Sequence, residues 1–148
     1  MQLQQVRSTK LPNPKSRWTN QYTKLNSSNF HEKLRQIFIN DSFFNKLSCY
    51  QEVQLSSLVP GYGSNQHCAD WYIEEFRLVI ELHGEQHYKR TSFGNTSYEE
   101  SLKNFNNIKY RDNLKKTALL DAGYEYLEIP YRDRDKVDAK YLIEKIYD

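Results

Sequence analysis

The sequence lacks most of the features that mark exported or membrane-spanning chains. It contains only two cysteines, Cys49 and Cys68, in 148 residues. No apolar run approaches the ~20 residues that a membrane-spanning helix needs, and the N-terminal segment has no apolar core typical of a secretory signal. Because nothing else points to export, we interpret both cysteines as reduced thiols and expect a cytoplasmic protein.

Acidic residues are missing from the N-terminal segment. Residues 1–31 contain no aspartate or glutamate but five lysines and arginines, a charge of +5, whereas the whole chain carries +2, so the remainder sums to −3. A basic, polar arm ahead of a near-neutral domain suits binding to a phosphate backbone. We predict an extended arm over 1–27; the alternative is a poorly ordered, solubilising tail. The candidate contacts to nucleic acid in this arm are Arg7, Lys10, Lys15 and Arg17.

The remaining residues, 28–148, have the length of one domain with a single core. The apolar run at 78–80 favours a central strand covered on both faces. Asn29 followed by Glu32 resembles a helix capping box, and Gly123 is a good stop for a long helix. Apolar periodicity therefore predicts an α/β domain. Its expected elements are a helix at 29–40, strands at 49–55, 68–73 and 76–83, a long helix from near Ser97 to Gly123, a strand at 124–129 and a final helix at 136–147.

Two carboxylates are expected to meet on neighbouring strands. Strand alternation places Glu81 and His83 on one face near the end of their strand, and Asp70 lies on the adjacent strand across a short hairpin. Such acids repel each other unless a cation lies between them. Hard oxygen ligands with room for water suit Mg²⁺ or Mn²⁺, which activate water for phosphodiester hydrolysis. The alternative is that Asp70 merely starts a strand and Glu81 points into solvent.

The two histidines that follow this strand have a spacing found in zinc sites. His83 and His87 are four residues apart, which suits zinc when both lie on one helix face. The preceding strand and Gly84 argue against a helix at this point. We therefore interpret His87 as a general base or phosphate contact, because an unperturbed imidazole titrates near neutral pH. The alternative is a turn histidine bonded to the backbone.

The order of these residues resembles that of a known nuclease superfamily. The likeness is carried by Asp70, by Glu-Leu-His-Gly-Glu-Gln-His-Tyr at 81–88, Tyr-Arg-Asp-Asn-Leu-Lys at 110–115, Gly-Tyr at 123–124 and Leu-Glu-Ile-Pro-Tyr at 127–131. This set resembles the PD-(D/E)xK superfamily, above all its very short patch repair endonucleases and related phage homing endonucleases. The likeness covers about residues 28–131. It implies a restriction-endonuclease-like core of order αβββαβ, here with an additional C-terminal helix, whose mixed central sheet is flanked by helices.

The resemblance also implies roles for individual residues. Asp70 and Glu81 would ligate the metal, with the main-chain carbonyl of Leu82 as a third ligand. His83 stands in place of the signature lysine and Ala69 in place of the signature proline, which leaves the identity of the general base open. The remaining residues carried over are Gln86, which would orient water or phosphate; His87, the second histidine; Glu32, which would complete the water shell of the metal; Asp112, an acid on the next helix; and Lys115, which would replace the missing lysine's charge.

Together these inferences predict a divalent-metal-dependent DNA endonuclease, and the resemblance makes a homing endonuclease the narrower expectation. Double-stranded DNA would be its partner, gripped by the arm and by the loop that holds Lys89 and Arg90. One active site would nick as a monomer, so double-strand cleavage would need a homodimer. The alternatives are a non-catalytic nucleic-acid-binding module of the same fold and a ribonuclease toxin.

Overall fold

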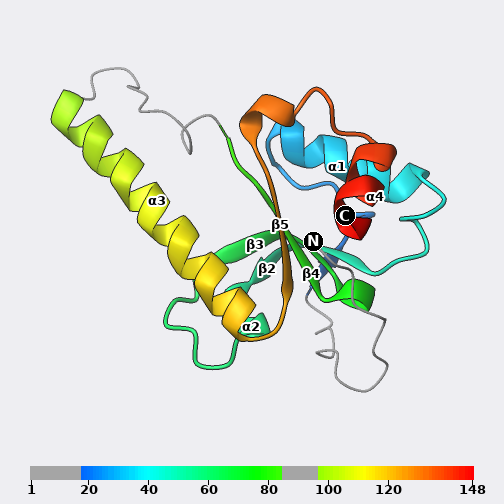
Figure 1. Cartoon of the computed structure of the whole chain (residues 1–148), viewed down its shortest axis with the longest axis horizontal. Helices are drawn as coiled ribbons and strands as arrows, with labels where there is room; N and C mark the ends of the chain where they lie inside the picture. The colour runs from blue at the N-terminus through cyan, green and yellow to red at the C-terminus, as the bar shows by residue number, and fades with distance from the viewer. Residues whose placement is uncertain (1–17, 85–96) are drawn as a thin grey trace.

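A mixed five-stranded sheet forms the centre of the protein (Figure 1). The structure is a computed structural model, and it describes residues 18–84 and 97–148. The strand order is β1-β2-β3-β4-β5; the first four strands pair antiparallel, and β4 pairs parallel with β5. The strands are β1 (Thr19–Asn20), β2 (Cys49–Gln54), β3 (Cys68–Ile73), β4 (Leu78–Leu82) and β5 (Glu125–Ile129). The prediction of an α/β fold with a mixed sheet is confirmed, and β4 is an interior strand as expected.

Helices lie on both faces of this sheet. Each predicted helix is present: the helix at 29–40 has the expected bounds, and the ends of the two later helices differ from those expected by at most three residues. The helices are α1 (Asn29–Asn40), α2 (Leu55–Leu58), α3 (Tyr98–Asp121) and α4 (Ala139–Tyr147), with short 3₁₀ turns at Glu74–Phe76 and Tyr131–Asp133. Strand β1 and helix α2 were not predicted, because two residues and one turn are too short to show a periodicity.

The start of α1 differs from the predicted capping box. The N-cap is Ser28 rather than Asn29, because the Ser28 hydroxyl accepts a hydrogen bond of 3.1 Å from the main-chain N–H of His31. Glu32 therefore does not occupy the reciprocal position of a capping box. Its carboxylate instead accepts hydrogen bonds from the Arg35 guanidinium at 2.8 and 2.9 Å.

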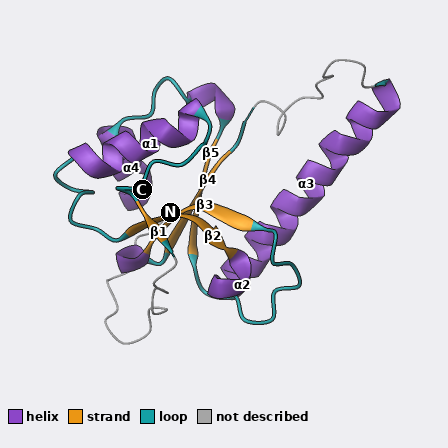
Figure 2. Cartoon of the chain, turned by 180° about the vertical axis from the view of Figure 1, so that it is seen from behind, coloured by secondary structure: helices purple, strands orange, loops and turns teal. Residues whose placement is uncertain are grey.

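Two layers of helices enclose the sheet (Figures 1 and 2). On one face α1 and α4 pack against the sheet through side chains such as Phe38 and Leu142, in one cluster with Ile80. On the other face α2 and α3 contribute Leu55 and Leu119 to a second cluster. Alternation along β4 sends side chains into both layers, which is why this strand reads as one continuous apolar run.

Strands β2 and β3 change faces in their middle. Residues two apart on a strand normally share a face, yet Trp71 packs with α1 and α4 whereas Ala69 packs with α2 and α3. Strand β2 changes layers at the same level, where Glu52 has a left-handed φ of 51°. The pairing register continues on both sides of this point and sets Glu52 opposite Asp70. Glu52 and Asp70 therefore lie at the level where both strands change faces.

The predicted arm overlaps the folded domain. The structure describes this segment only from Trp18 onward, so Arg7, Lys10, Lys15 and Arg17 lie outside the described residues. Residues 19–20 pair with β2 as strand β1. No helix in 18–84 or 97–148 is long and apolar enough to cross a membrane.

The end of α3 gives a direct test of the helix stop. Gly123 has a φ of +91°, and a Cβ added there would meet no atom within 4 Å, so the cost of a side chain is conformational rather than steric crowding with neighbours. We expect Gly123→Ala to lower the free energy of unfolding by about 1 kcal/mol, measured by urea denaturation. Gly63→Ala is the matched control, because Gly63 is equally open but lacks a positive φ. Equal stability of the two variants would contradict this account.

Candidate metal centre

Asp70 and Glu81 meet across β3 and β4, as the sequence indicated. The main-chain N–H of Asp70 donates to Glu81 Oε2 at 3.1 Å, and the N–H of Leu82 donates to Asp70 Oδ2 at 2.8 Å. The two carboxyl groups also share a hydrogen bond. Leu82 thus contacts this pair through its N–H, whereas the resemblance implied a role for its carbonyl. The backbone of both strands holds the acids in fixed positions.

Lys115 of α3 completes this cluster from the face of the sheet that α2 and α3 cover. Its Nζ lies 2.5 Å from Glu81 Oε1, and both side chains are buried. Burial lowers the pKa of Lys115, but attraction to Glu81 and Asp70 outweighs it, so the pKa is raised and the ammonium stays charged. The structure therefore brings together Asp70, Glu81 and Lys115, which the resemblance had linked across 45 residues of sequence.

The surroundings of the acid pair favour the retention of a proton. Burial raises the pKa of Glu81 to about 8, the negative charge of Asp70 adds to this effect, and Lys115 only partly opposes it. Burial also raises the pKa of Asp70. Two acids that share a site in this way cannot both ionise easily without a compensating cation. A divalent ion bound beside them would supply that charge and displace the proton.

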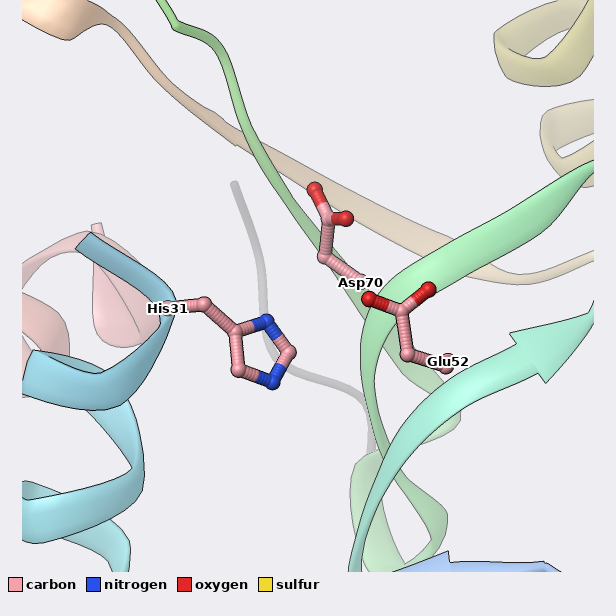
Figure 3. Close-up of side chains that lie close together, drawn as sticks. All are labelled: His31, Glu52 and Asp70. Carbon is pink, nitrogen blue, oxygen red and sulfur yellow. The ribbon is translucent and has the colours of Figure 1, made fainter. Parts of the chain in front are cut away.

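A second set of side chains, which includes His31 of α1, converges on Asp70. Within the described residues, one group of possible metal ligands is found: His31 from α1, Glu52 from β2 and Asp70 from β3 (Figure 3). One ligand atom from each lies within 4.8 Å of the others. Ligands around an octahedral Mg²⁺ or Mn²⁺ at about 2.1 Å lie about 3 to 4.2 Å apart. A small closure of the side chains would therefore let all three reach one ion.

His31 is prepared to act as a ligand by its own partner, Gln51. The side-chain NH₂ of Gln51 donates to the main-chain carbonyls of Asn20 (2.6 Å) and Thr23 (2.8 Å). The amide oxygen of Gln51 must therefore be the atom that accepts from His31 Nε2, at 2.8 Å. A neutral imidazole that donates through Nε2 keeps its lone pair on Nδ1. Such a carbonyl–histidine pair is the arrangement that fixes the tautomer of metal-binding histidines, and stacking on Trp71 at 4.8 Å fixes the ring.

Several predicted residues lie away from this centre. Glu32 faces Arg35, and its pKa is lowered to about 2 chiefly by hydrogen bonds from Arg35 and then Gln36. His83 follows β4, and its Nε2 lies 3.1 Å from Glu128 Oε1 on β5. Neither belongs to the ligand group formed by the described residues. His31 thus takes the place on α1 that the resemblance gave to the next residue along the chain.

The other predicted residues are on α3 or beyond the described ranges. Asp112 lies on α3, and its charge acts on Tyr126, whose pKa is raised by burial first and then by neighbouring acids that include Asp112. Gln86, His87, Lys89 and Arg90 all fall within 85–96, outside the described residues. Their predicted roles stay predictions.

Sequence reasoning missed His31 and Glu52. Ser28 as the helix cap would have placed His31 in the first turn of α1, but no sequence signal marked its side chain as a ligand. Glu52 occupies a polar position of an alternating strand, which usually faces solvent. Nothing in the local sequence predicts the positive φ of Glu52 or its position opposite Asp70.

No protein-family model matches the chain, and no curated protein or solved structure matches it either. The assignment of this centre therefore depends on its geometry and chemistry.

Metal binding gives the first test of the centre. We expect Mn²⁺ to bind the wild type. The substitution Glu52→Gln should raise the dissociation constant for Mn²⁺ at least tenfold, because an amide lacks the charge of a carboxylate ligand. Isothermal titration calorimetry would measure both. Glu32→Gln is the matched control, since it removes an acid one residue from His31 that faces Arg35 instead. If both variants lost the same affinity for Mn²⁺, the effect would come from the overall charge of the protein and not from Glu52 as a ligand.

The shared proton predicts a pH dependence of this binding. Below the raised pKa of Glu81, about 8, the metal-free pair holds a proton that the ion must displace. The apparent affinity for Mn²⁺ should therefore rise between pH 7 and 8, by at most tenfold per pH unit for one proton, and level off above pH 8. In Glu81→Gln the rise should be smaller. An affinity that is flat from pH 7 to 8 in the wild type would disprove the shared proton.

Proposed function

We propose that the protein is a divalent-metal-dependent nuclease that hydrolyses phosphodiester bonds in DNA. The observation that supports this proposal best is the convergence of two different sets of side chains on Asp70. His31 of α1 and Glu52 of β2 offer ligand atoms within 4.8 Å of one another and of Asp70. On the side of α3, the buried Lys115–Glu81 pair places a fixed positive charge beside the same carboxylate. Acids, an imidazole and a lysine at one point suit reactions at an anionic phosphate.

The residues of the chain would divide the work in a definite way. His31, Glu52 and Asp70 would hold the ion, which supplies Lewis-acid activation of water and of the phosphate when bound. The N–H of Leu82 orients the Asp70 carboxylate. Lys115 would stabilise charge on the phosphate, because a buried cation acts in a medium of low polarity. One nitrogen and two carboxylate ligands suit Mn²⁺ better than Mg²⁺, which prefers oxygen alone.

A restriction-endonuclease-like core is the finer fold that we propose. The order α1, β2, β3, β4, α3 and β5, with α4 added, is compatible with it, and so is an acid pair on adjacent antiparallel strands. Within that fold the chain would be a homing endonuclease, a narrower proposal that rests on the resemblance of its motifs. Its partner would be double-stranded DNA, met in part by the basic residues before Trp18. Cleavage of both strands would require a homodimer.

One observation favours a second candidate, a non-catalytic nucleic-acid-binding module. Glu81 uses Oε1 for Lys115 and Oε2 for the N–H of Asp70. An acid with both oxygens engaged has a structural role even without metal. Such a module would bind nucleic acid in a salt-dependent way without cutting it. A ribonuclease toxin on the same scaffold would instead cut RNA and spare DNA.

Cleavage of supercoiled plasmid tests the enzyme directly. We expect nicked product with Mn²⁺ or Mg²⁺, none with EDTA, and a loss of at least ~100-fold in Asp70→Asn, because Asp70 belongs to both sets of side chains. Asp135→Asn, which alters an exposed acid, should keep the wild-type rate. A wild type that cuts neither plasmid nor RNA with either metal, and behaves like Asp70→Asn, would falsify the nuclease proposal. Binding without cutting would then support the module.

A further inference from the structure

An open hollow lies beside the metal centre, between α3 and the loop that follows α2. Its volume is about 520 Å³, and it is lined by the loop residues 59–64 and by Leu114 and Ala118 of α3. This size lies within the range of small-ligand sites. Most of its lining is apolar, and Leu114 is 44% exposed. The hollow therefore offers a flat, mainly apolar group a place to pack.

Two cations border the apolar floor of this hollow. Arg111, Leu114, Lys115 and Ala118 are spaced by three, four and seven residues, so they share one face of α3. Arg111 and Lys115 also interact electrostatically with each other, and both act on Tyr62 and His67 of the facing loop. The charges therefore lie at the edge of the hollow and on the side of Glu81.

Tyr62 and His67 form a rigid pair opposite these cations. The Tyr62 hydroxyl lies 2.6 Å from His67 Nδ1. This distance is short for an N–H donor and ordinary for an O–H donor, so we assign the proton to Tyr62. Burial, Lys115 and Arg111 all lower the pKa of His67, which keeps it neutral near pH 7. A neutral imidazole that accepts at Nδ1 carries its N–H on Nε2, where it can donate to an anion.

We propose that this face is a nucleotide subsite: the hollow takes the base, and Arg111, Lys115 and His67 Nε2–H hold the phosphate. Charge selects the occupant, because two cations and a neutral donor at one end of an apolar hollow match an anion joined to a flat ring. This inference rests on the proposed nuclease function, since Lys115 also contacts Glu81 and sets the phosphate next to the metal centre. Tyr62 is a positioning residue, which acts by fixing the tautomer of His67.

The test measures binding without catalysis. Thymidine 5′-monophosphate is titrated into the full chain with EDTA present and followed by ¹H–¹⁵N NMR of the backbone and of the histidine rings. We expect shifts in residues 59–67 and at Leu114 and Ala118, and a His67 ring spectrum of the Nε2–H form. Arg111→Ala should weaken binding at least tenfold. Lys140→Ala, which removes one exposed charge from α4 on the opposite layer, should bind as the wild type does.

Two further variants separate the parts of the subsite. Ala118→Leu places a larger side chain in the hollow. It should weaken the binding of the mononucleotide and leave the affinity for inorganic phosphate unchanged. Tyr62→Phe should lose the fixed His67 tautomer while keeping a folded backbone spectrum. The proposal is overturned if the mononucleotide changes the chemical shifts of other residues only. It is also overturned if Arg111→Ala and Lys140→Ala bind the mononucleotide equally. A wild type that cuts DNA but shows no shifts here disproves the subsite alone, whereas shifts without cutting disprove the nuclease alone.

Discussion

The buried ion pair between Lys115 and Glu81 determines how the second layer meets the sheet. Among its described residues α3 buries only Ser101, Lys115 and Leu119, so this pair and Leu119 supply its main contacts deep in the domain. Removing two charges from water costs several kcal/mol per ion, and mutual attraction offsets this cost only with good geometry and further hydrogen bonds. The pair is thus better at fixing the position of α3 than at adding stability. That position in turn aims Arg111 at the loop that carries Tyr62.

The main elements of the fold could be predicted because burial sets the periodicity of the sequence. The run at 78–80 is apolar at every position since β4 is covered on both faces, and Gly123 ended α3 because it can adopt a positive φ. The short elements were not predicted, because β1 has two residues and α2 is a single turn. The N-cap of α1 was misplaced by one residue, since Ser28 and Asn29 can both cap a helix and Glu32 favoured the wrong one.

The site was predictable only where local geometry fixes it. Asp70 and Glu81 meet because a short hairpin and a period of two decide which side chains share a face. His31 and Glu52 join Asp70 because β2 and β3 change faces at one level, a property of the folded sheet that no local pattern of apolar residues encodes. Lys115 reaches Glu81 through long-range packing of α3, and only the resemblance of motifs pointed to it. Sequence periodicity thus specifies single elements, whereas their convergence on one carboxylate is a tertiary property.

The charges around Asp70 indicate which side of it a cation would occupy. Lys115 already contacts Glu81 on the side of α3. Glu52 lies opposite Asp70 with a left-handed backbone, and His31 Nε2 is bonded to Gln51. Like charges held together by a strained backbone destabilise the metal-free protein. Relief of that repulsion would add to the affinity for a divalent ion, so the same arrangement that weakens the empty centre would strengthen the occupied one. The ion is therefore expected among His31, Glu52 and Asp70, with Glu81 retained by its lysine.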